Sequence, residues 1–570
     1  MNKTTRREFL LSAGATLTGA AVTPRLFAAN PQAGLAAQPG APAQPGQTAA
    51  SRPILRGLMV DAGRVPEPLD YYRRVIEFCA DWELNALQFR LADDQGTALR
   101  FASVPGLLTH TNAFTPDQLR SLAEYAQSHG VDLIPELESF GHTGYITRTS
   151  AYAHLLDRQP EGTSNFTGVI PVSPETLPLF QKLYREVAAI FPSTYLHGGC
   201  DEVNWGGSAL SRNALRAKTR AQIWAEYLNS LHQVAQGLGK QFIVWGDFVL
   251  HKEPEILPQL DKRIIIMDWN YAENSSANLY ATFLKLRANG SRGIGAPGLA
   301  NYKWGARVGA EQLRNIDAYT DAYLAPADSA SLGVILTNWV PSRYVQNSIW
   351  DGFAYAAVAF RQGTATAQTS AFRRFVEKHY HAAWSQTWSE AFDIVYNAAP
   401  YMESKATASW MGLRLPVPWS TAEQLAALLK DGSPQPNPFT RLRALLVELE
   451  PQVLKNLSDF QAFALCVEYL ERLFWRNQVV LEHAAKLPDR ETAAELIQAI
   501  AQRDRALAEA LAKDWDSTRF PNALAKSEPV YDLRPKDQML FTWQQAANYS
   551  AQLASHPDRF YQLLQTARPA

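Results

Sequence analysis

Eight short apolar runs recur along residues 53–370, and their alternation with helical patterns limits the possible folds of this chain. The runs are rich in β-branched or aromatic residues and have the length of buried parallel strands. They span residues 55–60, 86–91, 131–136, 194–197, 241–245, 263–268, 293–296 and 333–337. Eight strands with crossover helices predict an α/β fold, a (β/α)8 TIM barrel, with a doubly wound open sheet as the alternative.

The segments between the runs carry start and stop signals for helices. Thr115 is a suitable N-cap, and Pro116 follows at the first helical position. Gly130 lies where that helix should end. Ser173 and Pro174 repeat the start signal before the next apolar helical pattern. These signals support crossover helices between parallel strands.

Beyond residue 370 the strand signals stop, and helical patterns follow over residues 439–454, 459–479 and 491–513. This change predicts a catalytic barrel over 53–370 and an all-α C-terminal region over 371–570. Three roles are open for the helical region. It packs against the barrel, shapes one side of the cleft, or holds a homodimer together.

Two segments precede the barrel. In residues 1–29, Arg6 and Arg7 stand before an apolar stretch and small residues, which is typical of a twin-arginine signal peptide. The stretch is shorter than the about 20 residues that span a bilayer. Residues 30–52 are rich in Ala, Pro, Gln and Gly and predict a disordered linker. We therefore expect a periplasmic or secreted protein with no membrane contact after the signal is removed.

Composition limits the partners. The formal net charge is -1 and no basic block follows the N-terminus, so we expect neither nucleic acid nor an anionic membrane as a partner. The three cysteines, Cys79, Cys200 and Cys466, are scattered and are expected to be buried free thiols. Neither metal-ligand spacing nor a glycine-rich phosphate loop stands out, so no metal and no cofactor are expected.

Polar and aromatic side chains follow most of the predicted strands. The active sites of such barrels lie at the carboxyl ends of the strands, so these side chains should converge on one mouth. Carboxylates, an arginine, a histidine and aromatic rings together suit a neutral sugar. The candidates are Asp61, Arg64, Asp93, Asp94, Glu136, Glu138, His142, His197, Asp201, Glu202, Trp245, Asp247, Asp268, Trp269, Tyr302, Asn338 and Trp339.

The sharpest local signal is the run from His197 to Glu202, in which Gly198 and Gly199 precede a cysteine and two adjacent acids. Glycines let the backbone turn out of the strand, so Asp201 and Glu202 should project into the mouth. Two carboxyls this close resist ionising together, so one pKa should rise. A raised carboxyl pKa is what a general acid near neutral pH requires.

This run resembles the His-x-Gly-Gly-Asp-Glu signature of glycoside hydrolase family 20, the β-N-acetylhexosaminidases. Residues 58–64 resemble the family's first-strand motif and its arginine. Residues 85–96 resemble its Asn-x-Leu-His-x-His-Leu-x-Asp-Asp-Gln-Gly run, and residues 134–142 its Ile-Pro-Glu…Pro-Gly-His run. The resemblance covers roughly residues 54–360. It implies retaining, substrate-assisted release of terminal β-linked N-acetylhexosamine.

The resemblance also implies a role for each matching residue. Glu202 would be the general acid and base, and Asp201 would hold the substrate's acetamido group. His142 and Asp93 would support the acid, and Tyr302 would donate to the acetamido oxygen. The expected sugar-binding residues are Arg64, which would hold ring hydroxyls, Asp247, and the three rings that would wall the acetamido pocket, Trp245, Trp269 and Trp339.

The chain departs from the family pattern in three places. Residues 302–304 are Tyr-Lys-Trp where the family has Tyr-Leu-Asp, and residues 339–341 are Trp-Val-Pro where it has Trp-x-Glu. Phe140 replaces the proline before Gly141. The two missing carboxylates usually bind distal sugar hydroxyls. The preference between gluco and galacto sugars is therefore open, and a decorated substrate is possible.

Structural alternatives remain for single residues. His142 would be a satisfied core histidine, Asp93 and Asp94 would cap a following helix, Arg64 would pair at the surface, and the tryptophans would be ordinary core. Two other functions also remain. One is a glycosidase with Glu136 or Glu138 as a conventional nucleophile opposite Glu202, and the other is a sugar-binding protein without catalysis.

Overall fold

The structure is a computed structural model, and it describes residues 54–157, 168–299, 309–397, 420–431, 437–520 and 539–568. The predicted signal peptide and linker lie outside the described residues, so both remain predictions. Residues Ile54–Ala570 form one compact unit by their contacts.

Eight parallel strands close into a barrel, which confirms the predicted fold class and excludes an open sheet. Around the barrel the order is β1-β11-β10-β9-β8-β7-β6-β2, with β1 beside both β2 and β11. Each predicted run agrees with an observed strand to within two residues. The strands are β1 (Leu55–Asp61), β2 (Ala86–Arg90), β6 (Asp132–Glu136), β7 (Tyr195–His197), β8 (Gln241–Trp245), β9 (Ile265–Asp268), β10 (Arg292–Gly295) and β11 (Ser331–Leu336).

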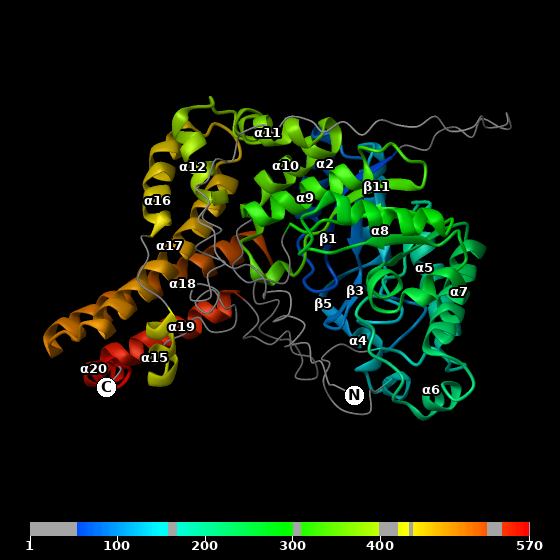
Figure 1. The fold of residues 1–570 in the computed structure, drawn as a ribbon, viewed down its shortest axis with the longest axis horizontal. Coiled ribbons are helices and arrows are strands. Elements are labelled where there is room, and N and C mark those ends of the chain that lie inside the picture. Colours follow the sequence, from blue (N-terminus) through cyan, green and yellow to red (C-terminus); the bar gives the residue numbers. More distant parts are fainter. Residues whose placement is uncertain are drawn as a thin grey trace. The chain divides into compact units, whose positions relative to one another are not determined.

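Helices surround the strands (Figure 1). The longer ones are α2 (Leu69–Asp81), α3 (Pro116–Ser128), α5 (Thr176–Ile190), α7 (Arg220–Gly237), α8 (Ser276–Ala288), α9 (Ala310–Tyr323) and α10 (Trp350–Gln362). Thr115 caps α3 through its side chain, as predicted. Helix α5 begins two residues after Pro174, because Ser173 and Pro174 lie in the turn before it. Between β8 and β9 a π-helical turn (Asp247–Lys252) and a 3-10 turn (Pro254–Gln259) replace the crossover helix.

A small second sheet was not predicted. It consists of β3 (Ala92–Asp93), β4 (Gly96–Leu99) and β5 (Thr109–Phe114) and follows β2 at the mouth of the barrel. The alternative in which Asp93 and Asp94 cap a following helix is therefore wrong, because the chain turns back into β4. Asp94 instead accepts a 2.9 Å hydrogen bond from the backbone of Gly144, the first residue of α4 (Gly144–Thr147).

An all-α region follows the barrel, as predicted, and the described residues after β11 contain no strand. Its helices are α11 (Thr364–His379), α12 (Gln386–Asn397), α15 (Ala422–Asp431), α16 (Pro438–Leu449), α17 (Leu457–Ala485), α18 (Arg490–Thr518), α19 (Met539–Ser555) and α20 (Pro557–Thr566). Helix α11 runs across residue 370, and the division of the chain there remains a prediction. None of the described helices has the length and apolar character needed to cross a bilayer.

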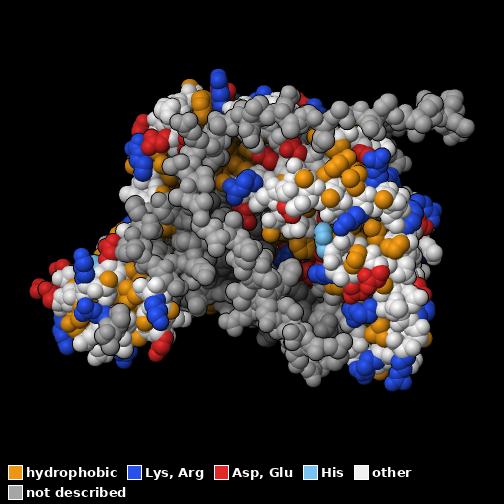
Figure 2. All heavy atoms as spheres, in the orientation of Figure 1, with side chains coloured by type: hydrophobic (Ala, Val, Ile, Leu, Met, Phe, Trp, Pro, Cys, Tyr) orange, Lys and Arg blue, Asp and Glu red, His pale blue; other side chains and the backbone are white. Residues whose placement is uncertain are grey.

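Charged side chains of both signs are interspersed on the described part of the face in Figure 2. This pattern agrees with the net charge of -1. All three cysteines are free and buried, which confirms that expectation.

Candidate active site

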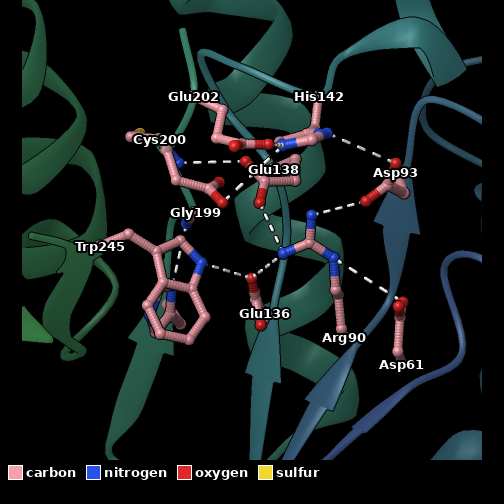
Figure 3. Close-up of polar contacts among 12 residues, drawn as sticks. Asp61, Arg90, Asp93, Glu136, Glu138, His142, Gly199, Cys200, Glu202 and Trp245 are labelled. Atoms are coloured by element: carbon pink, nitrogen blue, oxygen red, sulfur yellow. Dashed lines mark hydrogen bonds and ion pairs between the residues drawn. The ribbon is translucent and has the colours of Figure 1, made fainter. Parts of the chain in front are cut away.

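The ends of β1, β2, β6, β7 and β8 bring most of the predicted site residues together around Arg90 (Figure 3). The guanidinium group of Arg90 lies 2.5 Å from Glu136 Oε1, 2.7 Å from Glu138 Oε1 and 2.6 Å from Asp93 Oδ2. Its Nε lies 3.8 Å from Asp61 Oδ1. Burial lowers the pKa of Arg90, but these carboxylates outweigh burial and hold it well above its usual value. Arg90 is therefore a permanent buried cation among acids.

Arg64 makes the second cationic contact of this cluster. Its Nη1 lies 2.8 Å from Asp61 Oδ2, and its Nη2 lies 3.0 Å from Asp93 Oδ2. The side chain is 13% exposed, so the alternative of a surface ion pair is wrong. The guanidinium group also lies 5.3 Å from the ring centre of Trp339. The predicted contact of Arg64 with a sugar remains a prediction.

His142 connects two groups of acids. Its Nδ1 lies 3.6 Å from Asp93 Oδ1 and 3.4 Å from Asp94 Oδ2, and its Nε2 lies 3.3 Å from Glu202 Oε2 and 3.8 Å from Asp201 Oδ2. Burial lowers the pKa of His142, but Asp93 and Asp201 outweigh burial and raise it well above its usual value. His142 is thus buried between carboxylates that favour its charged form.

Asp201 and Glu202 lie in the loop after β7, and the Glu202 side chain points toward His142 (Figure 3). The side chain of Glu202 is 28% exposed, and that of Asp201 is 9% exposed. Among the residues that the structure describes, no group forms a hydrogen bond to the buried Oδ1 of Asp201. A buried carboxylate oxygen without a donor is rare in proteins, because leaving it unpaired costs about 1–3 kcal/mol. It is an acceptor available to a bound ligand.

Backbone strain is concentrated around these acids. Glu202, His142 and Cys200 have positive φ angles of 45°, 48° and 75°. Val340, at the opposite side of the mouth, has φ 54°. Residues other than glycine rarely adopt this conformation, and a β-branched residue such as valine does so at a clear cost. Strain of this kind gathers where a structure holds functional side chains in place.

Two glycines allow the loops after β6 and β7 to fit together. A Cβ on Gly141 would lie 2.0 Å from the backbone oxygen of Asp201. A Cβ on Gly199 would lie 2.1 Å from Oε2 of Glu138. That same Oε2 accepts a 3.0 Å hydrogen bond from the backbone of Cys200. The position of the acid pair therefore depends on the absence of side chains at both glycines.

Asp247 and Cys200 lie next to the segment that carries the acid pair. Oδ2 of Asp247 accepts hydrogen bonds from the backbone of Glu202 at 3.2 Å and from Nζ of Lys252 at 2.8 Å. Burial raises the pKa of Asp247, and Lys252 opposes this shift. The Cys200 thiol donates a hydrogen bond to the backbone oxygen of Gly198. Burial is the largest of the causes that raise the pKa of this thiol well above its usual value. The predicted sugar contact of Asp247 remains a prediction.

Aromatic rings line the mouth beside the acids. The ring centres of Trp245 and Trp339 lie 5.6 Å apart, and Trp269 stacks on Tyr271 at 5.1 Å. Trp245 and Trp339 belong to one buried apolar cluster, and the partly buried Trp269 and Tyr271 pack against it. Nε1 of Trp245 donates to Glu136 Oε1 at 2.9 Å, and Nε1 of Trp339 donates to the Tyr271 hydroxyl at 2.7 Å. Trp245 and Trp339 thus lie side by side, and the wall that the three tryptophans would form around an acetamido group remains a prediction.

Three site residues either lie outside the described part of the chain or were not predicted. Tyr302 lies outside the described residues, so its role remains a prediction. Arg90 was not predicted, although it occupies the position of the second histidine in the family's Asn-x-Leu-His-x-His run. Tyr271 was not predicted either, and its place two residues after Trp269 was the available signal.

One group of metal-capable side chains occurs in the described part of the chain. The possible ligand atoms of Asp93, Asp94 and His142 lie within 4.8 Å of one another. Oδ2 of Asp93 is already bound by the guanidinium groups of Arg64 and Arg90. A metal ion would compete with both arginines and with the charge on His142, so the ion-pair network fits these residues better.

Substitution of Arg90 tests the central ion pairs. Arg90→Met leaves Glu136 and Glu138 buried without their cation, and we expect a loss of about 3–5 kcal/mol in the free energy of unfolding, measured with urea. The matched control is Arg120→Met, which breaks an exposed pair with Asp117 and should cost less than about 1 kcal/mol. Similar losses in both variants would contradict the central role of Arg90.

The loss in Arg90→Met should depend on pH. A buried carboxyl without its cation has a folded-state pKa above its unfolded value, so the folded variant binds more protons than the unfolded chain. Its stability then falls as pH rises. Arg90→Met should therefore be closer to the wild type at pH about 5 than at pH about 8, in urea unfolding at both values. An equal loss at both values would speak against buried, unpaired acids.

Comparison with known proteins identifies the same region of the chain. Residues 55–297 match the glycosyl hydrolase family 20 catalytic domain. The β-hexosaminidase subunit beta of Mus musculus is 25% identical over 218 residues, which are 36% of this chain and 40% of that protein. The β-N-acetylhexosaminidase of Cellulomonas fimi is 30% identical over 166 residues, 26% of this chain and 33% of that protein. The chain thus spans two fifths or less of the length of these relatives.

A solved structure gives a weaker likeness. The exo β-N-acetylglucosaminidase of Vibrio harveyi shares 20% identity and a TM-score of 0.42, over 55% of this chain and 53% of that one. A TM-score this low supports no conclusion about the site. The matched residues end at 297, before Tyr302 and Trp339. Residues 55–297, less than half of the chain, are thus distantly similar to the glycoside hydrolase family 20 catalytic domain, at about 25% identity to β-hexosaminidase relatives.

Proposed function

We propose that this protein releases terminal, non-reducing β-linked N-acetylhexosamine from glycans by a retaining, substrate-assisted mechanism. The observation that carries the proposal is the pair Asp201 and Glu202 at the exit of β7. Asp201 has a buried carboxylate oxygen with no donor among the described residues, and the more exposed Glu202 contacts His142. One acid is thus arranged to accept a hydrogen bond, and the other to exchange a proton with a substrate.

In the proposed reaction, the acetamido oxygen of the substrate attacks its own anomeric carbon while the glycosidic bond breaks. Glu202 gives its proton to the leaving oxygen, and Asp201 accepts a hydrogen bond from the acetamido N–H as positive charge develops there. In the second step Glu202 takes a proton from water, which attacks the anomeric carbon and opens the cyclic intermediate. The rings of Trp245, Trp269 and Trp339 would enclose the acetamido group.

The burial of Glu136 and Glu138 favours substrate assistance over a conventional nucleophile. Both residues are 0% exposed. The oxygens of Glu136 accept hydrogen bonds from Arg90, Trp245 and Gln88. Burial and Asp201 raise the pKa of Glu138 well above its usual value, while its ion pair with Arg90 opposes this shift. A nucleophile must reach the anomeric carbon, and neither carboxyl is placed to do so.

The missing distal carboxylates bear on the choice of sugar. Pro341 stands where the family has glutamate, and it begins a 3-10 turn instead of presenting a charge. Among the described residues, Arg64 is then the charged group that best fits ring hydroxyls at this side. We therefore infer that this chain discriminates less strictly between sugars that differ at a distal hydroxyl than the family pattern implies. Both gluco and galacto substrates belong in a first screen.

Substitution of the acid pair tests the catalytic roles. Glu202→Gln removes the proton donor and should lower kcat by about 10²–10⁴-fold on a chromogenic N-acetylglucosaminide. Asp201→Asn should also lower kcat strongly, because an amide stabilises the developing charge less well. Glu175→Gln is the control, since its side chain is 64% exposed and should leave kcat unchanged. Full activity in Glu202→Gln would exclude this residue as the acid.

Substrate choice tests the assisted mechanism independently. The wild type should cleave chromogenic N-acetylhexosaminides and leave the matching glucosides and galactosides almost intact, because these lack the attacking amide. A thiazoline that mimics the cyclised intermediate should inhibit competitively. Cleavage of plain glucosides at a similar rate would indicate a carboxylate nucleophile. Binding of N-acetylglucosamine without turnover of any substrate would indicate a sugar-binding protein.

We also propose export through the twin-arginine route, on the basis of Arg6 and Arg7 and the apolar stretch after them. Replacement of both arginines by lysine should keep the full-length protein in the cytoplasm of a bacterial host. Cell fractionation and immunoblotting measure this. The same distribution for the wild type and the variant would contradict the proposal.

A further inference from the structure

An arginine from the helical region reaches two loops at the mouth of the barrel. Arg519 is the C-cap of α18, and its side chain is 1% exposed. Its Nε donates to Glu67 Oε1 at 3.0 Å, in the loop after β1. Its Nη2 donates to the backbone oxygen of Pro341 at 2.7 Å, and its Nη1 to that of Tyr344 at 3.2 Å. One guanidinium group thus joins the loops after β1 and β11.

The loop after β11 carries Trp339 and needs support from outside. Val340 has a left-handed backbone, which is unfavourable for a β-branched residue. Its N–H donates to Asp61 Oδ2 at 3.1 Å, and Asn338 donates to the Tyr344 hydroxyl at 2.7 Å. Contacts to both ends of the 3-10 turn Pro341–Arg343 hold the loop in this conformation. Arg519 supplies those contacts through the two carbonyl groups.

The loop in turn places Trp339 against the cationic part of the site. The ring centre of Trp339 lies 4.9 Å from the guanidinium carbon of Arg90 and 5.3 Å from that of Arg64. Its Nε1 donates to the Tyr271 hydroxyl. A shift of the loop would therefore move one wall of the sugar pocket and the face on which Arg64 rests.

One further contact joins the two loops to each other, and another joins the loop after β1 to the helices. Oε2 of Glu67 accepts a 2.8 Å hydrogen bond from Gln346, so Glu67 itself bridges the two loops. Val65, in the loop after β1, packs in an apolar cluster with Trp515 of α18 and Leu540 of α19. Arg519 therefore lies at the polar centre of an interface between α18 and the loops after β1 and β11.

We propose that Arg519 is a positioning residue for sugar binding, and that the helical region holds one wall of the active site through it. The expected effect on KM rests on the proposed function, whereas the structural role of Arg519 does not. The charged fork binds two carbonyl groups and one carboxylate at once, which a lysine cannot do. The helical region would thus act on affinity for the sugar rather than on proton transfer by Glu202.

Kinetics of the full chain test this role. Arg519→Ala and Arg519→Lys should raise KM about tenfold, as expected for the loss of one charge-assisted contact, and change kcat less than about twofold. Arg503→Ala is the control, because Arg503 pairs with Glu471 inside the helical region and should leave KM unchanged. Unchanged KM in both Arg519 variants, or an equal rise in Arg503→Ala, would overturn the proposal.

A spectroscopic measurement separates this proposal from the proposed function. In protein labelled with 5-fluorotryptophan, the ¹⁹F resonance of Trp339 is assigned by its loss in Trp339→Phe. It should shift or broaden in Arg519→Ala and Arg519→Lys and stay in place in Arg503→Ala. This result needs no turnover, so it stands even if no N-acetylhexosaminide is cleaved. An unmoved Trp339 resonance in the folded Arg519→Lys variant would overturn the proposal.

Discussion

The guanidinium group of Arg90 holds carboxylates from three consecutive elements of the barrel within one buried layer. Glu136 ends β6 and Glu138 follows it, Asp93 follows β2 in the small sheet, and Asp61 ends β1. Several acids this close together would repel one another and resist burial without a cation. Arg90 allows them to stay buried, and their positions in turn fix the polar groups nearer the substrate.

Asp93 connects this buried layer to the polar groups that lie nearer the mouth. Burial raises the pKa of Asp93, but Arg64, His142 and Arg90 outweigh burial and lower it well below its usual value. A fixed anion at Asp93 keeps the His142 imidazolium in place, and His142 contacts Glu202. The acid pair thus stands at the end of a series of alternating charges whose innermost member is Arg90. The order of charges follows from the parallel strands, which deliver all these side chains to one edge.

The sequence was most informative where structure follows from local pattern. All eight strands were predictable, because buried parallel strands appear as continuous apolar runs between helix signals. The acid pair was predictable from its own short run, from His197 to Glu202. The small sheet was not, because two aspartates before a glycine equally suit a helix cap. The contacts of Arg90 with Glu136 and Glu138 and those of Arg519 were not predictable either, because these partners are distant in sequence and only the folded chain brings them together.

The position of Cys200 has a consequence for chemical durability. Its thiol lies directly beside the acid pair, yet it is buried, bonded to the backbone oxygen of Gly198, and held in its neutral form by the raised pKa. Oxidants and alkylating reagents attack the thiolate, so a reagent that enters the mouth of the barrel would meet no reactive sulfur at this position. Burial therefore protects the sulfur atom next to Asp201 and Glu202 from oxidation and alkylation.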